Sequence, residues 1–306
     1  MSTSSTDGEG EERPPSEPPL ILLRQAKSLL RRLGKRPLKS LGQHFLVDTG
    51  VLGKIVAAAR LTEQDTVIEV GPGLGILTQE LARHVDRVIA VELDPALAGF
   101  LRQTLAPYKN VTIVQADILR TDPAALLQGP YKVVADLPYN IAAPTLRHFL
   151  EAEAKPELIV VMVQREVARR IAAEPGDMSP LSIGIQLYGH PTIAAIVPPR
   201  SFYPSPKVHS AILRIEVHPK PAVDVPPDSL FRVVRAGFGQ PRKQLRNTLA
   251  AGLGLKPPEA ESLLATAGID ARRRPETLSL EEWAALTRAA GTLVQEHGGM
   301  NRKPSQ

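Results

Sequence analysis

The sequence predicts an α/β domain on a mostly parallel, seven-stranded sheet, followed by a small all-α domain at the carboxyl end. Two observations predict this fold class. Between residues 48 and 217, short runs rich in β-branched residues alternate with segments of helical periodicity, as in strands joined by crossover helices. From Ser229 to about Gln295, the periodicity is helical throughout and no strand-like run interrupts it.

The α/β region opens with a helix and the first three strands. Asp48 is a short acceptor of the kind found at helix N-caps, and it predicts a helix over residues 48–60. Pro95 suits the first turn of a later helix, where a backbone N–H would have no partner. Strands are expected at 66–70, 87–91 and 111–114, with helices at 76–82 and 95–105.

The second half of the α/β region supplies the remaining strands. Residues 158–163 are continuously apolar, which is typical of a central strand covered on both faces. The runs 192–197 and 210–217 indicate an antiparallel closing pair, with residues 200–207 in the loop between them. A further strand is expected at 131–135, with helices at 144–153, 164–173 and 182–188.

Composition excludes several classes of protein. The 306 residues contain no cysteine, which excludes a disulfide framework and a thiolate metal site, and the histidines show no metal-ligand spacing. No apolar run reaches the length of about 18 residues that suggests a membrane span. The first residues are polar and acidic, unlike a signal peptide. We therefore expect a cytoplasmic protein without a metal ion or a membrane partner.

A glycine-rich turn follows the first predicted strand. The segment Gly71-Pro72-Gly73-Leu74-Gly75 stands between strand 66–70 and helix 76–82, where glycines let the backbone turn tightly and a ligand approach. Ile76 occupies the place of the third glycine of dinucleotide-binding turns, which disfavours a nicotinamide-dependent oxidoreductase. A plain tight turn between strand and helix is the structural alternative.

Acidic residues end the strands around this turn. Glu92 follows strand 87–91, where a carboxylate can accept hydrogen bonds from both hydroxyls of a ribose. Asp117 follows the third strand, where it could accept from an adenine amino group. Each acid alone suits a solvated strand end equally well. Because parallel strands bring their carboxyl ends to one edge, the turn and the acids are expected to converge on one crevice.

The segment Asp136-Leu137-Pro138-Tyr139 ends the predicted strand 131–135. Asp136 and a neighbouring backbone carbonyl can accept hydrogen bonds from an exocyclic amine, and the ring of Tyr139 can stack on a base. This chemistry suits methyl transfer to the amino nitrogen of adenine. A plain strand-end turn is the alternative.

Taken together, these motifs resemble the ribosomal RNA adenine N6-dimethyltransferases, and the small-subunit branch of that family in particular. The resemblance runs in order through Lys39–Leu46, Glu69–Gly75, Glu92–Asp94, Gln115–Ile118, Asp136–Ile141, Val163–Ala168, Phe202–Val208 and Arg242–Asn247.

The resemblance implies a Rossmann-like methyltransferase fold and S-adenosyl-L-methionine as cofactor. It implies N6,N6-dimethylation of two adjacent adenines in a terminal loop of 16S rRNA within the small ribosomal subunit, by a monomer. By the same resemblance, Asp136 and Tyr139 are catalytic, and the cofactor contacts are His44, Leu46, Gly71, Glu92, Asp117 and Asp136.

The chain departs from the family at two places. Asp136 stands where Asn is usual, and His44 stands where Asn is frequent. Aspartate remains a hydrogen-bond acceptor and histidine can still pack or donate, so activity is expected, with the rate and pH dependence open. A non-catalytic RNA-binding assembly factor that keeps the methyltransferase fold is the alternative.

Charge distribution completes the expected domain organisation. The net charge is +5, and cations gather between residues 24 and 39 and in the helical region, where Arg272-Arg273-Arg274 form a run. These suit a phosphate backbone, although a solvated face would look the same. The expected divisions are a disordered, acidic then basic extension over 1–36, a catalytic domain over 37–218, a helical RNA-binding domain over 219–295 and a disordered tail over 296–306.

Overall fold

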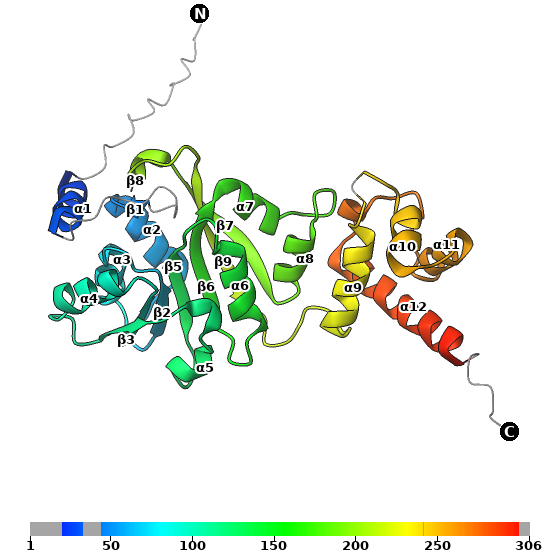
Figure 1. The fold of residues 1–306 in the computed structure, drawn as a ribbon, viewed down its shortest axis with the longest axis horizontal. Helices are drawn as coiled ribbons and strands as arrows, with labels where there is room; N and C mark the ends of the chain where they lie inside the picture. Colours follow the sequence, from blue (N-terminus) through cyan, green and yellow to red (C-terminus); the bar gives the residue numbers. More distant parts are fainter. Residues whose placement is uncertain (1–19, 33–43, 241, 300–306) are drawn as a thin grey trace, which may run out of the picture.

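A seven-stranded sheet forms the centre of the larger of two lobes (Figure 1). The computed structural model describes residues 20–32, 44–240 and 242–299. The strands lie in the order β4-β3-β2-β5-β6-β9-β7. The pairings β6–β9 and β9–β7 are antiparallel and the other pairings are parallel, in agreement with the predicted antiparallel closing pair. Their bounds are β2 Thr66–Val70, β3 Arg87–Glu92, β4 Val111–Gln115, β5 Lys132–Asp136, β6 Leu158–Gln164, β7 Gly189–Val197 and β9 Ser210–Val217.

Helices cover both faces of this sheet. Alternate residues of one strand enter opposite clusters: Val67 packs with α2 and α3, whereas its neighbour Ile68 packs in the cluster that holds α6 and α8. The α helices of this lobe are α2 Thr49–Ala59, α3 Ile76–Leu81, α4 Pro95–Thr104, α5 Pro123–Leu126, α6 Ala142–Glu151, α7 Arg165–Ile171 and α8 Pro180–Gln186. The short 3₁₀ helices are η2 Ile118–Arg120 and η3 Pro199–Ser201.

The predicted loop 200–207 contains regular structure. It begins within η3 and carries the short strand β8, Phe202–Tyr203, which pairs antiparallel with β1, Phe45–Leu46. This two-stranded ribbon ties the segment before α2 to the closing strands. As expected from the sequence, Asp48 caps α2 by accepting hydrogen bonds from the N–H groups of Gly50 and Val51.

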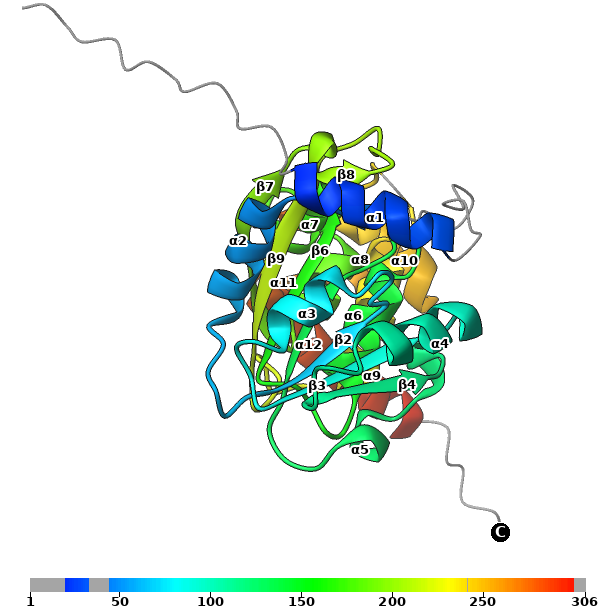
Figure 2. The ribbon, with the colours of Figure 1, turned by 90° about the vertical axis from the view of Figure 1, so that its left-hand side faces the viewer.

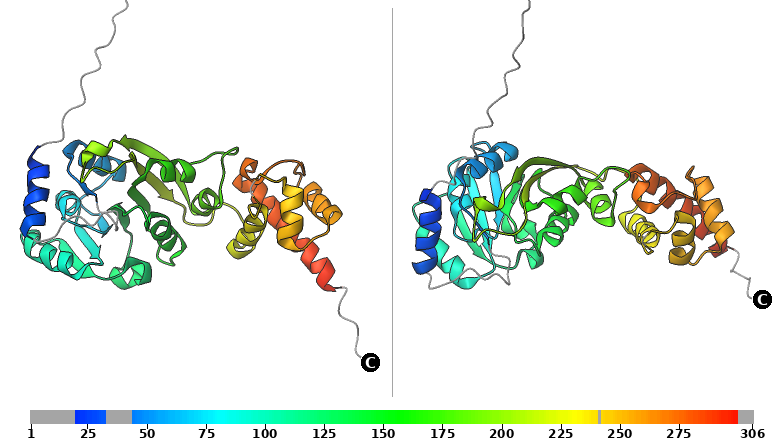
Figure 3. Two further views of the ribbon diagram at one scale, coloured as in Figure 1. Left: turned by 45° about the horizontal axis from the view of Figure 1, so that its top comes forward. Right: turned by 90° about the horizontal axis from the view of Figure 1, so that it is seen from above.

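The second lobe contains only helices in its described residues (Figure 3). Its core surrounds Trp283, which is fully buried, and Gly237 lies so close that a β-carbon there would meet the Trp283 ring at 2.3 Å. Backbone N–H groups of Gly176 and Met178 donate to the carbonyl of Glu276 and connect the lobes. The elements are α9 Pro227–Gly237, α10 Leu245–Leu253, α11 Pro257–Thr266, η4 Pro275–Thr277 and α12 Leu280–Gly299.

The ends of the chain differ from the expected disorder where the structure describes them. Within 1–36, residues Leu20–Arg32 form helix α1, which packs on the larger lobe at the side away from the second lobe (Figure 3). Within 296–306, helix α12 continues to Gly299. The rest of both segments lies outside the described residues. None of the described helices combines the length and apolar character that a bilayer span requires.

Candidate active site

A cavity lies where β2, β3 and β5 end, at the carboxyl edge of the sheet. The polar groups that line it come from the glycine turn, the strand ends and the segment before β1. The lining includes all the predicted site residues except Asp117: His44, Leu46, Gly71, Glu92, Asp136 and Tyr139. The predicted convergence of separate strand ends on one crevice is therefore present in the structure.

The glycine turn lies close against its neighbours. Gly73 has a φ of +58°, and a β-carbon there would lie 3.3 Å from the ring of Phe45. Gly75 has a φ of +78°, and its β-carbon would lie 2.9 Å from the side chain of Leu101 in α4. Both positions combine a left-handed backbone with little space, which only glycine tolerates without strain. The turn thus brings backbone N–H groups up to the cavity.

Glu92 is fixed by the backbone around it. Its Oε2 accepts from the N–H of Gly73 at 3.3 Å, and its Oε1 accepts from the N–H of Asp94 at 2.9 Å. The side chain is buried, and burial raises its pKa although these hydrogen bonds act in the opposite direction. Each carboxylate oxygen keeps a lone pair for a further donor, as a pair of ribose hydroxyls would provide.

Glu69 is a buried acid of this cavity that was not predicted as a site residue from the sequence. It lies in β2 between Ile68 and Val70, is 1% exposed, and its Oε2 has no hydrogen-bond partner among the described residues. Burial raises its pKa to about 8, and the neighbouring carboxyls of Asp136 and Glu92 add to that rise. The Thr78 hydroxyl lies close enough to lower this pKa partly, without forming a hydrogen bond of normal geometry. An acid inside an otherwise apolar strand was the available sequence signal.

Asp136 ends β5 and is half-buried on the cavity. Burial raises its pKa to about 8. Tyr139 follows in the same segment and is held by a hydrogen bond of 2.9 Å between its hydroxyl and that of Ser210. The N–H of Ile141 donates to the carbonyl of Pro138, which closes the segment into a turn. This arrangement keeps a carboxyl oxygen and an aromatic ring on the same side of the cavity.

His44 and Leu46 line the cavity from the segment before and within β1. The Nδ1 of His44 lies 2.6 Å from the carbonyl oxygen of Pro204, so this nitrogen donates. The imidazole lies with its centroid 5.9 Å from that of the Tyr139 ring, tilted by 31°. Leu46 is buried, with 4% of its surface exposed. The remaining residues of the predicted motif, 39–43, lie outside the described residues.

Asp117 lies at the end of β4 but is not among the residues that line the cavity. Its Oδ1 accepts from the N–H of Leu119 at 3.0 Å, which caps η2, and its Oδ2 is 3.6 Å from Nε of Arg120. The role of Asp117 as a cofactor contact stays a prediction. Leu93, directly after Glu92, and Leu119 are both exposed, at 68% and 36%. Apolar side chains thus accompany both acids at this edge.

The lining as a whole suits a cationic ligand that carries a ribose. Glu69, Glu92 and Asp136 contribute carboxyl groups, whereas the described lining residues include no lysine or arginine. A buried carboxyl oxygen without a partner favours a ligand that can donate to it. The glycines of the turn carry no side chains, so a ligand can lie against the backbone there.

Comparison with known proteins gives a consistent result. The family described as ribosomal RNA adenine dimethylase matches residues 35–290. Two proteins named ribosomal RNA small subunit methyltransferase A are similar along most of their length. The one from Dehalococcoides mccartyi strain 195 is 50% identical, over 87% of this chain and 92% of its own length. The one from Moorella thermoacetica is 44% identical, over 85% and 95%.

Solved structures agree with the sequence matches. The 23S rRNA methyltransferase ErmE superposes with a TM-score of 0.64 at 28% identity, covering 80% of this chain and 98% of its own. A dimethyladenosine transferase from Plasmodium falciparum reaches a TM-score of 0.69 at 23% identity, covering 83% and 98%, and supports the fold. The matched region spans the sheet, the cavity and the helical lobe. This chain belongs to the ribosomal RNA adenine dimethylase family and is a methyltransferase.

Proposed function

We propose that this chain transfers methyl groups from S-adenosylmethionine to N6 of two adjacent adenines in a terminal loop of 16S rRNA, within the small ribosomal subunit. The family match and the names of its relatives support the class of reaction and substrate. The observation that carries the proposal is the position of Asp136. It is a half-buried acceptor on the same cavity as the glycine turn, with Tyr139 beside it.

The strand ends would hold the cofactor. Glu92 would accept hydrogen bonds from the two ribose hydroxyls, and Asp117 would accept from the adenine amino group beside the exposed Leu93 and Leu119. The unpaired Oε2 of Glu69 would accept from an ammonium group. Gly71, His44 and Leu46 would supply contacts along the wall. When bound, S-adenosylmethionine supplies an electrophilic methyl group on its sulfonium.

Asp136 and Tyr139 would orient the target base. The amino nitrogen of adenine is a poor nucleophile because its lone pair is delocalised into the ring. Asp136 and the carbonyl of Leu137 or Pro138 would accept hydrogen bonds from this amino group and aim the lone pair. The ring of Tyr139, fixed through Ser210, would stack on the base. Most of the rate enhancement would come from this positioning. A base in a loop leaves its stack at low cost, which would let it reach the cavity.

The helical lobe would bind rRNA through its unpaired cations. Arg246 and Arg272 are engaged with Glu261 and Asp270, so they contribute less free charge than the sequence indicates. Arg274 is exposed and makes no side-chain ion pair or hydrogen bond within the described part of the chain. The other exposed cations of this lobe include Arg232, Arg235, Arg242 and Lys243. We expect the protein to act as a monomer.

Mass spectrometry of rRNA nucleosides tests the proposal. Small subunits that lack the modification are incubated with the protein and isotope-labelled S-adenosylmethionine. Labelled N6,N6-dimethyladenosine should form with wild type and be strongly reduced with Asp136→Ala. Sequencing of the modified fragment identifies the nucleotides. If wild type binds the subunits without transferring label, the alternative of a non-catalytic assembly factor holds instead.

A further inference from the structure

Helix α1 carries an apolar stripe that packs onto the wall of the cavity. Ala26 is fully buried and Leu30 is 6% exposed, and both belong to one cluster with Phe45, Val47 and Leu74. The partly buried Leu22, Leu23 and Leu29 join the same cluster. Arg24, Ser28 and Arg31 lie on the exposed side. Figure 2 shows α1 lying across the larger lobe beside β8. An amphipathic helix docked by its apolar side is held mainly by that packing.

The residues beneath α1 are themselves part of the cavity. Phe45, Leu74 and Ile76 line it on one side and pack against α1 on the other. Phe45 also lies against Gly73, whose N–H donates to Glu92. Two residues, Phe45 and Gly73, therefore lie between α1 and the carboxylate proposed to hold the ribose.

A second set of contacts runs from α1 to the side of the cavity that holds the aromatic rings. The Nζ of Lys27 lies over the ring of Tyr203, 5.2 Å from its centroid. Tyr203 pairs with Phe45 in the β1–β8 ribbon, and the next residue, Pro204, accepts the hydrogen bond from His44. His44 in turn lies beside the Tyr139 ring. Helix α1 is thus connected to both halves of the cavity wall.

We propose that α1 is a positioning element of the cofactor site: its docking holds Phe45 and Leu74 in place, so that cofactor binding and α1 docking stabilise each other. This inference rests on the proposed function of the cavity. Helix α1 lies upstream of residues 35–290, which the family matches. The sequence predicts that this stretch is a basic RNA-binding extension, and its docking would stabilise cofactor binding as well.

Hydrogen exchange of the full-length wild type tests the coupling directly, with S-adenosylhomocysteine as the probe. Coupling is reciprocal, so a ligand that binds more tightly when α1 is docked must also favour docking. Saturation should slow exchange of the amides in the second half of α1 by at least threefold. Unchanged exchange in α1, with clear protection of the glycine turn, would overturn the proposal.

A pair of matched variants gives the second arm. We call the buried contact between α1 and the larger lobe the seam. Ala26→Glu places a charge in this seam, whereas Ser28→Glu places the same charge on the exposed side of the same helix. The apparent affinity for the ligand scales with the fraction of molecules in which α1 is docked and Phe45 and Leu74 are held at the cavity. If undocking leaves about a tenth of them competent, calorimetry should show about a tenfold rise in Kd for Ala26→Glu. Ser28→Glu should bind like wild type.

Leu30→Ala serves as a milder seam variant, checked by circular dichroism, should Ala26→Glu fail to fold. It should weaken binding by two- to fivefold. Equal Kd values for wild type and a folded seam variant would overturn the proposal. An equal loss of affinity in Ser28→Glu would do so too. Failure of wild type itself to bind S-adenosylhomocysteine would instead refute the proposed function, on which the role of α1 rests.

Discussion

The pH dependence of methyl transfer should report on Asp136, and replacing this residue by Asn or Ala should separate its hydrogen-bonding role from its charge. Asn keeps an acceptor oxygen for the adenine amino group, so Asp136→Asn should stay active. Ala offers no acceptor and leaves a desolvated N–H of the base unpaired. Loss of one positioned partner typically costs about 10²–10³ in rate, so Asp136→Ala should lose most turnover while cofactor binding falls only modestly.

The magnitude of the pH effect follows from burial. The pKa of Asp136 is raised to about 8 in the free protein. At pH 7 only about a tenth of the molecules would carry the carboxylate that attracts a sulfonium, and kcat/KM reports the free enzyme. In wild type, kcat/KM should therefore rise with pH and level off above about 8. At low pH it should approach the activity of the Asn variant, because a protonated carboxyl keeps its carbonyl acceptor.

The Asn variant should differ in a defined way. Its kcat/KM should depend less on pH below about 8. Any decrease in kcat/KM that remains at low pH would be caused by protonation of Glu69. That decrease should lie at lower pH than in wild type, because the Asp136 carboxyl contributes to the raised pKa of Glu69. The assay is transfer of labelled methyl groups to undermethylated subunits at subsaturating cofactor, from pH 5.5 to 9.5. Superimposable wild-type and Asn profiles would refute the charge argument, and full activity of Asp136→Ala would refute the assignment of this segment.

Three further outcomes are expected. Glu92→Ala should remain folded but lose measurable S-adenosylmethionine binding in calorimetry, since two hydrogen bonds to a charged acceptor are worth about 2–4 kcal/mol; wild-type affinity would exclude the ribose role. Without cofactor, the folded state of wild type retains the protons of Asp136 and Glu69 above the ordinary carboxyl pKa, so stability should fall between about pH 4 and 8, and Asp136 contributes up to about 1.4 kcal/mol per pH unit of that fall. Melting curves should show a smaller fall for Asp136→Asn, and parallel curves would contradict the shift. Arg273→Ala should destabilise the helical lobe by about 1–2 kcal/mol in denaturant unfolding, whereas Arg274→Ala should leave stability unchanged but weaken RNA binding and reduce the salt slope by about 0.7–0.9.

The order of elements and much of the cavity follow from local patterns. Runs such as 158–163 are apolar throughout because the strand is covered on both faces, and parallel strands then bring their carboxyl ends to one edge. Glu92 and Asp136 reach the cavity for this reason alone. Asp117 meets the same rule but does not line the cavity, because its short side chain caps η2 instead. A local hydrogen bond within two residues competes with a ligand for the same oxygen.

Helix α1 shows where counting charge falls short. Its cations indicate an RNA-binding extension, but Leu22, Ala26, Leu29 and Leu30 recur at helical spacing, which indicates a docked helix. That periodicity predicts burial without identifying the surface that is covered. The covering partners, Phe45 and Leu74, come from separate segments that meet only in the folded lobe. The proposed effect on the cofactor site therefore could not be predicted from the sequence.

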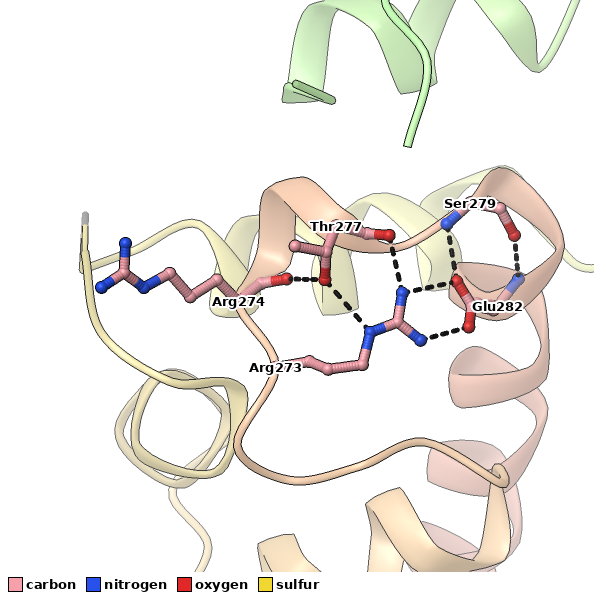
Figure 4. A network of polar contacts seen from close by, with 5 residues as sticks. All are labelled: Arg273, Arg274, Thr277, Ser279 and Glu282. Carbon is pink, nitrogen blue, oxygen red and sulfur yellow. Dashed lines mark hydrogen bonds and ion pairs between the residues drawn. The ribbon is translucent and has the colours of Figure 1, made fainter. Parts of the chain in front are cut away.

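The run Arg272-Arg273-Arg274 makes the same point within three residues. Figure 4 shows Arg273 turned into the lobe, where it donates to Glu282 and to the carbonyl of Thr277, while Arg274 points away. The sequence does place Glu282, since Ser279 and Glu282 form the capping box of α12. It does not show that the loop returns Arg273 to that carboxylate. Consecutive cations in a loop take directions set by the path of the backbone, so a basic run gives the total charge, and only the fold decides which cation remains for a phosphate.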